Sequence, residues 1–329
     1  MKTNLKFIGI DVSKHTLDIC ILTDTSTSLV IKNTKASIGK FFSNLLKDTT
    51  LKYHICMENT GRYSWTLIDI LTPMLCKVYV VNPLHLKRSL GLTRGKNDKV
   101  DAIRIAHFIK KNHTELTLFV PKRKELKLLQ ILVSERKSRV NQRQELLTKN
   151  KEIQVVSHSK IISSIIKKNN KLIKELSSQI KDFETEIKKL IKNDTSLNKL
   201  DNQLRSVPGI GNILSWNLLI KTNEFKTIKT PRKLACYAGV APFANTSGIS
   251  VFGRNRVSNL ADKALKKLLH LGAMSAIRLD NDLAVYFNRK VEQGKNKMSV
   301  LNAVRNKMIH IVFALIKNQN FYQNRLILS

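Results

Sequence analysis

The sequence predicts an α/β domain with a mixed sheet, then long helices, then a mainly helical C-terminal domain. Three observations lead to this fold class. Short runs rich in valine and isoleucine alternate with helical patterns over residues 1–120. Residues 121–196 are rich in Lys, Glu, Leu and Ile, and no proline lies between Pro121 and Pro208. Residues 197–329 hold further apolar helical segments, so we expect three domains with these boundaries.

The first domain is expected to contain a β-hairpin followed by single strands that alternate with helices. Strands are predicted where valine and isoleucine cluster between turn residues, at 5–12, 17–23, 28–32, 53–57 and 78–81. A helix over 36–47 follows from apolar residues at the i, i+3, i+4, i+7 and i+8 positions of one face, and further helices are expected at 65–71 and 98–111. A hairpin joined to strands that are connected through helices gives a mixed sheet.

The middle domain is expected to contain two long helices, one over 122–154 and one after a polar break at 157–160. A 4-3 spacing typical of a coiled-coil seam runs through Ile162, Ile166, Asn169, Ile173, Leu176, Ile180, Phe183, Ile187 and Leu190. A hairpin of the two helices and a contact with a second chain would both bury this seam. We favour a homo-oligomer, from dimer to tetramer, because the seam otherwise needs cover from within the chain.

The C-terminal domain is expected to begin near residue 197 and to be mainly helical. Helices are predicted through Trp216 and Leu219, over 261–278 and over 297–317. Between them, residues 242–259 are rich in Gly, Ser and Asn, a composition typical of a loop.

Composition and charge indicate the class of partner. Lys and Arg total 58 against 24 Asp and Glu, a formal net charge of +34, which favours phosphate-bearing partners and above all nucleic acid. The four cysteines form no CxxC pair, so free thiols in a reducing compartment are expected rather than zinc or disulfides. We find no apolar run of about 18 residues and no signal peptide, and therefore expect a cytoplasmic protein with no membrane partner.

Four carboxylates stand out in this basic chain. Asp11 and Glu58 each lie at the end of an apolar strand-like run, and Asp98 and Asp101 are three residues apart at the start of a helix. If they converge, their oxygens can hold one or two Mg²⁺ ions for phosphoryl transfer. Any one of them alone would be a solvated strand end or a helix cap. Asp18 lies in mid-strand, and we expect it to be exposed and outside the set.

Two C-terminal segments hold further candidate residues. The turn with Gly209 and Gly211 resembles a helix-hairpin-helix element whose backbone N–H groups approach phosphate, although an ordinary interhelical turn has the same sequence pattern. Ser247 precedes a glycine, and a serine hydroxyl attacks a phosphodiester when a base or a metal activates it; a plain Ser-Gly turn is the other interpretation. Arg254 and Arg256 follow and suit bidentate phosphate contacts.

Several segments together resemble the DEDD transposases of bacterial insertion sequences. In chain order these are 7–14 (FIGIDVSK), 58–63 (ENTGRY), 82–83 (NP), 94–102 (RGKNDKVDA), 208–211 (PGIG), 237–242 (YAGVAP), 247–248 (SG) and 294–297 (GKNK). The resemblance covers about residues 5–317. It departs from the family pattern at 258–262 (SNLAD), where many members have a basic, glycine-containing run before the next helix.

The resemblance implies an RNase H-like (RuvC-like) N-terminal domain, a coiled-coil middle and a C-terminal transposase domain. It implies that Asp11, Glu58, Asp98 and Asp101 coordinate Mg²⁺ and that Ser247 attacks DNA to form a covalent phosphoserine. Members act as tetramers whose sites combine the two domains from different subunits, and a bridge RNA pairs with donor and target DNA.

We therefore expect an RNA-guided DNA recombinase of an insertion sequence. Two other functions stay open. One is a Holliday-junction-type nuclease that uses the four carboxylates and water. The other is a nucleic-acid-binding protein without catalytic activity.

Overall fold

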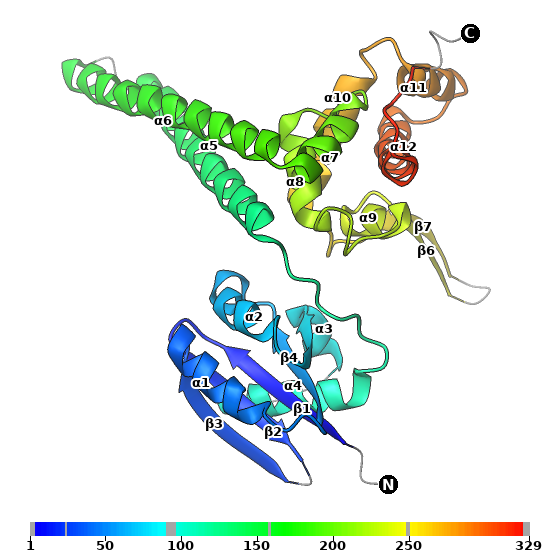
Figure 1. Cartoon of the computed structure of the whole chain (residues 1–329). Coiled ribbons are helices and arrows are strands. Elements are labelled where there is room, and N and C mark those ends of the chain that lie inside the picture. Colours follow the sequence, from blue (N-terminus) through cyan, green and yellow to red (C-terminus); the bar gives the residue numbers. More distant parts are fainter. Residues whose placement is uncertain (1–3, 24, 90–96, 157–158, 248–250, 325–329) are drawn as a thin grey trace. The chain divides into compact units, whose positions relative to one another are not determined.

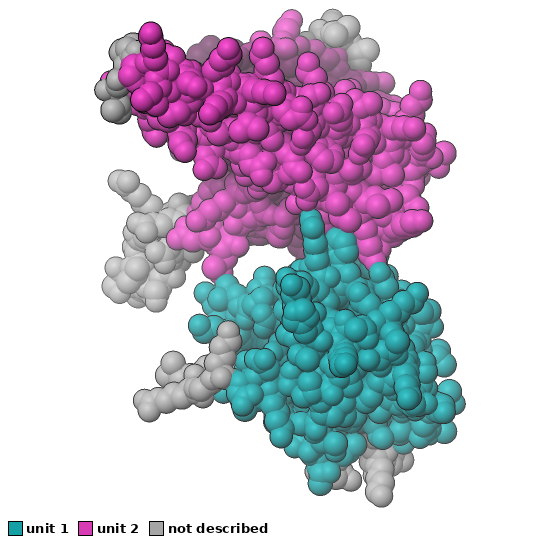
Figure 2. Space-filling view, turned by 90° about the vertical axis from the view of Figure 1, so that its left-hand side faces the viewer, with its two compact units in different colours: residues 1–121 teal, residues 122–329 magenta. Residues whose placement is uncertain are grey.

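A computed structural model describes residues 4–23, 25–89, 97–156, 159–247 and 251–324 of the chain (Figure 1). These residues form two compact units, 1–121 and 122–329 (Figure 2). Each unit has a hydrophobic core of its own. The long helices, which were expected to be a separate middle domain, belong to the second unit.

The first unit is built on a five-stranded sheet with the order β3-β2-β1-β4-β5. β1, β2 and β3 pair antiparallel, whereas β4 runs parallel to β1 and β5 runs parallel to β4. The strands are β1 (Leu5–Val12), β2 (Thr16–Leu22), β3 (Ser26–Lys32), β4 (Lys52–Glu58) and β5 (Cys76–Val81). The expected mixed sheet is confirmed.

Helices cover both faces of this sheet. α1 (Lys35–Leu45) and α2 (Trp65–Leu71) pack on the face that carries Ile8, Ile10 and Ile55. α4 (Asp98–Asn112) packs on the opposite face, against side chains that include Phe7 and Cys56. The alternation of buried residues along each strand explains the two cores. A short helix not expected from the sequence, α3 (Pro83–Ser89), and a 3₁₀ turn, η1 (Gly61–Ser64), complete the unit.

The second unit begins with a helical hairpin of α5 (Lys124–Val156) and α6 (Lys160–Asn193), which lie along each other (Figure 1). The polar seam residue Asn169 donates its Nδ2–H to Oδ1 of Asn150 on α5, at 2.7 Å. Asn150 in turn donates to Oδ1 of Asn170, at 3.0 Å. The seam therefore has cover from within the chain, which removes our reason for favouring association; the oligomeric state stays a prediction.

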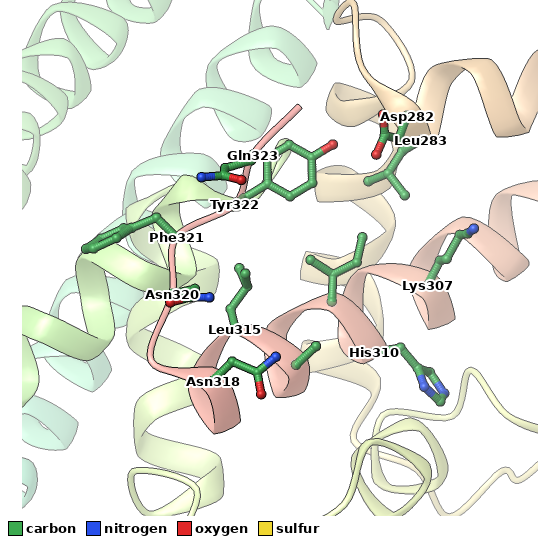
Figure 3. A pocket seen from close by; sticks show the side chains of 12 residues that line it. Asp282, Leu283, Lys307, His310, Leu315, Asn318, Asn320, Phe321, Tyr322 and Gln323 are labelled. Carbon is green, nitrogen blue, oxygen red and sulfur yellow. The ribbon is translucent and has the colours of Figure 1, made fainter. Parts of the chain in front are cut away.

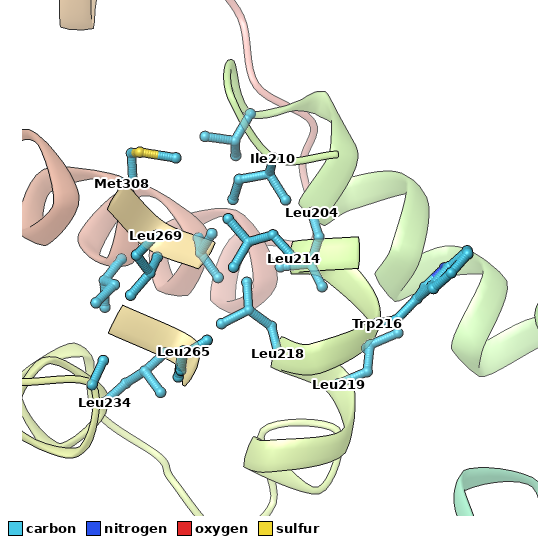
Figure 4. Packing of buried hydrophobic residues seen from close by; sticks show 14 of the residues in the cluster. Leu204, Ile210, Leu214, Trp216, Leu218, Leu219, Leu234, Leu265, Leu269 and Met308 are labelled. Atoms are coloured by element: carbon cyan, nitrogen blue, oxygen red, sulfur yellow. The ribbon is translucent and has the colours of Figure 1, made fainter. Parts of the chain in front are cut away.

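The rest of the second unit is a helical bundle with one β-hairpin. Its helices are α7 (Thr195–Ser206), α8 (Asn212–Thr222), α9 (Pro231–Tyr237), α10 (Lys263–Ala276), α11 (Asp282–Glu292) and α12 (Lys297–Asn318). α9 and α11 were not expected from the sequence. Leucines of α8 and α10 meet in the core, among them Leu214, Leu218, Leu265 and Leu269 (Figure 4).

The expectation of a loop over residues 242–259 was wrong. β6 (Pro242–Ser247) and β7 (Val251–Val257) pair antiparallel over most of this segment. Valine and phenylalanine, which favour strands, occur on both sides of the Ser-Gly pair in the sequence. Their signal was outweighed by the surrounding Gly, Ser and Asn residues.

The expectation that no apolar segment reaches membrane-spanning length was also wrong. By length and composition, α12 passes that test, alone among the helices of the described ranges. Its buried face, which includes Val304, Met308 and Val312, packs into the core of the second unit. A core helix of a globular bundle accounts for the same composition. All four cysteines are free thiols, as expected.

Candidate active site

Two of the predicted carboxylates come from neighbouring parallel strands. Asp11 lies near the end of β1, and Glu58 is the last residue of β4. The register pairs Ile10 with Met57, so Asp11 and Glu58 lie one step further along at the same end of the sheet. Alternate residues of β1 share a face, which places Asp11 on the face of Phe7, where α4 packs.

The other two carboxylates come from the first turn of α4. The side-chain oxygen of Asn97 accepts a hydrogen bond from the backbone N–H of Lys99 at 3.1 Å and caps the helix. Helix α4 therefore begins at Asp98, and Asp98 and Asp101 both lie in its first turn. Residues three apart on a helix point to the same side.

Gly9 allows α4 to approach β1 closely. A Cβ atom at Gly9 would lie 2.2 Å from the backbone nitrogen of Ala106 and 2.3 Å from the carbonyl oxygen of Ala102. Both contacts are with backbone, which cannot rotate away. The glycine thus fixes how near the helix that carries Asp98 and Asp101 comes to the strand that carries Asp11.

We expect Gly9→Ala to lower the free energy of unfolding by about 3 kcal/mol, because the added methyl overpacks a backbone contact. Gly39 in α1 is the matched control, since a Cβ there meets nothing within 4 Å. Gly39→Ala should be neutral or stabilising by up to about 1 kcal/mol. Urea unfolding of both variants measures the difference, and equal stabilities would contradict the close approach.

The electrostatics of Asp11 shows that the four carboxylates interact. Burial, and then the charges of Asp98, Asp101 and Glu58 in that order, together raise the pKa of Asp11 to about 6. An acid with an ordinary pKa of 3.8 thus becomes harder to ionise, first because it is partly buried and then because its neighbours are also acids. The structure brings the four predicted residues into one electrostatic group.

These carboxylates are near one another, but their side chains are not arranged as a complete metal-coordination site. Asp101 makes an ion pair with Arg104, with 2.9 Å between Oδ1 and Nη1. Within the described ranges, no three Asp, Glu, His or Cys side chains are close enough to hold a metal ion as they stand. The donors are all carboxylate oxygens, the ligand type that Mg²⁺ prefers, and this ion retains several waters and needs only one or two carboxylates.

Asp18 corrects one of our expectations. It is half-buried rather than exposed, and it lies directly opposite Asp11 in the β1–β2 pair. Residues paired across a sheet share a face, so Asp18 joins the acidic group. Burial and the nearby Asp98 raise its pKa. Asp18 and Lys99 also line a small cavity of about 100 Å³.

Ser247 belongs to the other compact unit, as the last residue of β6. The strand register pairs it with Val251 of β7, which is the last pair of the β6–β7 ladder. Arg254 and Arg256 are residues of β7. The side chains of residues 244–256, and all of 248–250, lie outside the described part of the chain.

A polar cluster anchors the chain just after this hairpin. Oδ2 of Asp262 accepts hydrogen bonds from Lys221 Nζ at 2.8 Å and from Tyr237 Oη at 3.1 Å, and Oδ1 accepts from the backbone N–H of Leu265 at 2.9 Å. Asp262 thus caps α10 and ties it to α8 and α9. It lies in the segment where the sequence departs from the family pattern, and sequence reasoning gave it no role.

The two glycines of the 208–211 turn differ in their surroundings. Gly209 has φ 84°, and a Cβ there would lie 2.1 Å from the carbonyl oxygen of Gly272 in α10. Close packing of the turn on α10 therefore accounts for this glycine. Gly211 is exposed, is the N-cap residue of α8 and has open space beside it. Contact of either glycine with nucleic acid stays a prediction.

Comparison with known proteins matches two family models to this chain. A family model for DEDD transposases of the IS110 type matches residues 8–161, which include all four predicted carboxylates. A second model, described as a transposase of the IS116/IS110/IS902 family, matches residues 201–288, which include Ser247.

Individual relatives carry related names. The pilin gene-inverting protein of Moraxella lacunata is 28% identical over 329 residues, which cover 97% of this chain and 98% of the relative. The protein of the same name from Moraxella bovis is 27% identical over the same coverage. A 43.6 kDa protein of insertion element IS110 from Streptomyces coelicolor is 28% identical over 123 residues, which are 37% of this chain and 30% of that protein. The chain belongs to the IS110 family of transposases.

Proposed function

We propose that this transposase cuts and rejoins DNA with Mg²⁺ bound by Asp11, Glu58, Asp98 and Asp101 and with Ser247 as the nucleophile. One observation carries the metal-binding part of the proposal: burial and three neighbouring carboxylates together raise the pKa of Asp11 to about 6. Such a group is unfavourable in a metal-free protein, and a divalent cation would relieve the repulsion. Functional sites are where perturbed pKa values cluster.

The sheet supports an RNase H-like first domain. Three antiparallel strands at one side, followed by two parallel strands, give the order β3-β2-β1-β4-β5. The carboxylates lie at one end of its central strands and at the start of the covering helix. When bound there, Mg²⁺ would neutralise charge on the scissile phosphate and on the leaving oxygen. Arg104 would hold the carboxylate of Asp101 in place through its ion pair.

Ser247 would act on the same phosphodiester as the carboxylates. Its hydroxyl oxygen attacks phosphorus and loses its proton, the bond to one deoxyribose oxygen breaks, and that oxygen leaves with a proton as a free hydroxyl. The product is a phosphoserine ester, and attack by another DNA hydroxyl reverses the step and rejoins the strand. Because the ester bond is conserved through the exchange, no external energy source is needed.

The partners follow from charge and from the relatives. A formal charge of +34 suits donor and target DNA together with a bridge RNA. Gly209, Gly211, Arg254 and Arg256 are our candidates for phosphate contacts. The two near-full-length relatives are named for inverting a pilin gene, and we extend this to recombination between two defined DNA sites. The resemblance to the transposase family, rather than the seam of α6, is our basis for expecting a cytoplasmic dimer or tetramer.

A denaturing gel tests the nucleophile. Wild-type protein, incubated with labelled DNA of the element ends, its RNA and Mg²⁺, should give a DNA-linked protein band. Ser247→Ala should give none, because no other hydroxyl replaces it, whereas Thr246→Ala should keep the band. Recombination by Ser247→Ala at the wild-type rate would contradict the serine mechanism.

The same gel separates the other two functions. A water-dependent nuclease would cut the DNA without a protein-linked band, in wild type and in Ser247→Ala alike. A binding protein without catalytic activity would leave the DNA intact while retarding it on a native gel.

A further inference from the structure

The C-terminal part of the second unit contains a cavity outside the candidate active site. It has a volume of about 530 Å³ and lies between α11, α12 and the segment 319–324 (Figure 3). This volume falls within the range of about 300–1,000 Å³ that is usual for small-molecule sites. Neither the carboxylate group nor Ser247 lines it.

The segment 319–324 forms a wall that is fixed in position. Gln203 on α7 donates its Nε2–H to the carbonyl oxygen of Asn320 at 3.2 Å. The backbone N–H of Tyr322 donates to Ser206 Oγ at 2.9 Å, and Asn324 Nδ2 donates to the carbonyl oxygen of Asp280 at 2.9 Å. These three hydrogen bonds fix the segment on α7 and beside α11, and the N–H of Asn320 also donates to the carbonyl oxygen of Leu315 in α12 at 3.0 Å. The wall is thus tied to the bundle at several points, so the cavity is preformed.

The cavity can take a flat ring. The aromatic ring of Tyr322 extends from the segment toward Asp282 and Leu283, and Leu315 lies on the α12 side (Figure 3). An aromatic ring on one side and aliphatic side chains on the other are how enzymes hold an unstacked base. Phe321, next in the chain and 54% exposed, is available to a neighbouring base at the rim.

Polar groups line the same cavity. Lys307 Nζ lies 4.6 Å from the centroid of the Tyr286 ring, a cation–π contact that orients the ammonium group. Asp282 offers carboxylate oxygens to amino and imino N–H groups of a base. The side-chain amides of Asn318 and Asn320 make no hydrogen bond to any residue in the described ranges, which leaves their donors and acceptors available for a base edge.

We infer that this cavity binds one unstacked base of a single nucleic acid strand, with Lys307 at the adjoining phosphate. The inference rests on the proposed function, since it requires a strand as the natural ligand. It adds a site at which the protein distinguishes unpaired from paired nucleic acid. A base within a duplex cannot enter, because it is stacked and paired.

Fluorescence polarisation with three probes tests the inference: a DNA strand of about 20 nucleotides, the RNA of the same sequence, and the DNA duplex. Tyr322→Leu should weaken binding of the DNA strand, the RNA strand or both by about tenfold, because the stacking surface is lost. Tyr322→Phe keeps the ring and should stay within about twofold of wild type. The strand that loses affinity identifies the natural source of the base.

A second variant, in which the lysine of the cavity is replaced, tests the same inference independently of the tyrosine. Lys307→Met should lower the salt dependence of single-strand binding by about one phosphate contact, whereas Lys317→Met, on the same helix but outside the cavity, should lower it less. Thermal unfolding checks that each variant is folded. The inference fails if folded Tyr322→Leu binds both single strands as wild type does, or if it loses duplex affinity equally. Absence of nucleic-acid binding by wild type would instead overturn the proposed function.

Discussion

Asp11→Asn is expected to abolish DNA cleavage and, in the absence of divalent cations, to stabilise the protein. The loss of activity should reach about a thousandfold, because the metal's several kcal/mol of transition-state stabilisation disappear with its central ligand. The gain in stability has a separate cause. The amide is neutral, so the repulsion among Asp11, Asp98, Asp101 and Glu58 and the burial of an ionised group are both relieved.

The stability effect depends on pH in a defined direction. The pKa of Asp11 rises from its ordinary 3.8 to about 6 on folding. A group whose pKa is raised stabilises the fold while it is protonated, and this contribution is lost as pH rises through about 6. Two pKa units correspond to at most about 3 kcal/mol, and partial exposure of the carboxyl reduces the expected difference to about 1–2 kcal/mol.

Urea unfolding in EDTA measures this difference. Wild type and Asp11→Asn should have similar stability near pH 4, and the variant should be the more stable at about pH 7. Asp182→Asn, an exposed aspartate on α6, is the control and should match wild type at both pH values. A variant that is less stable than wild type at neutral pH would show that the carboxylates do not repel one another.

The residues of the acidic group could be predicted from the sequence, with one omission. Asp11 and Glu58 each end an apolar run, and Asp98 begins a helical pattern, so local signals located them. The sequence did not predict that Asp18 belongs to the group, because the residue pattern along one strand does not show which residues of the neighbouring strand lie opposite. The turn supplies that register: Ser13 N–H donates to the carbonyl oxygen of Thr16 at 3.0 Å, and counting outward from this pair sets Asp18 opposite Asp11.

The middle region shows why a seam does not identify its partner. The spacing of apolar residues in α6 is regular, whereas α5 contributes arginines to the contact and has no comparable stripe. Arg136 pairs with Glu184 at 2.6 Å, and Arg139 donates to Gln179 Oε1 at 2.9 Å. Long arginine stems cover apolar surface while their charged ends reach polar partners. A search of the sequence for a second apolar seam therefore does not identify α5 as the helix that covers α6.

Arg123→Met is expected to lower the free energy of unfolding of the second unit by about 3–5 kcal/mol, the usual effect of removing one partner from a buried ion pair. Arg123 lies just before α5 and bonds two carboxylates. Its Nη2–H donates to Asp194 Oδ1 at 2.8 Å and to Glu224 Oε1 at 2.6 Å, and its Nε–H donates to Glu224 Oε2 at 2.9 Å. Glu224 is only 6% exposed.

The cluster joins three parts of the chain that are far apart in sequence. Asp194 caps α7 by accepting from the N–H of Leu197 at 2.9 Å. Glu224 lies in a turn after α8 in which Asn223, Glu224 and Phe225 all have left-handed φ values, of 51°, 55° and 64°. Each such residue costs about 1 kcal/mol or more, so the turn needs external support. Arg123 provides it, because both oxygens of Glu224 are bonded to this guanidinium.

Arg136→Met is the matched control, because Arg136 also pairs with a carboxylate through two nitrogens. In that pair the carboxylate side chain of Glu184 is 31% exposed, against 1% for that of Glu224, so its loss should cost no more than about 1 kcal/mol. Acid titration adds an independent signature. Hydrogen bonds from Arg123 hold the pKa of Asp194 at about 2, so wild type should lose stability as pH falls from about 4 toward 2. Arg123→Met should lack most of this loss, and equal stabilities of the two variants would show that the cluster does not support the turn.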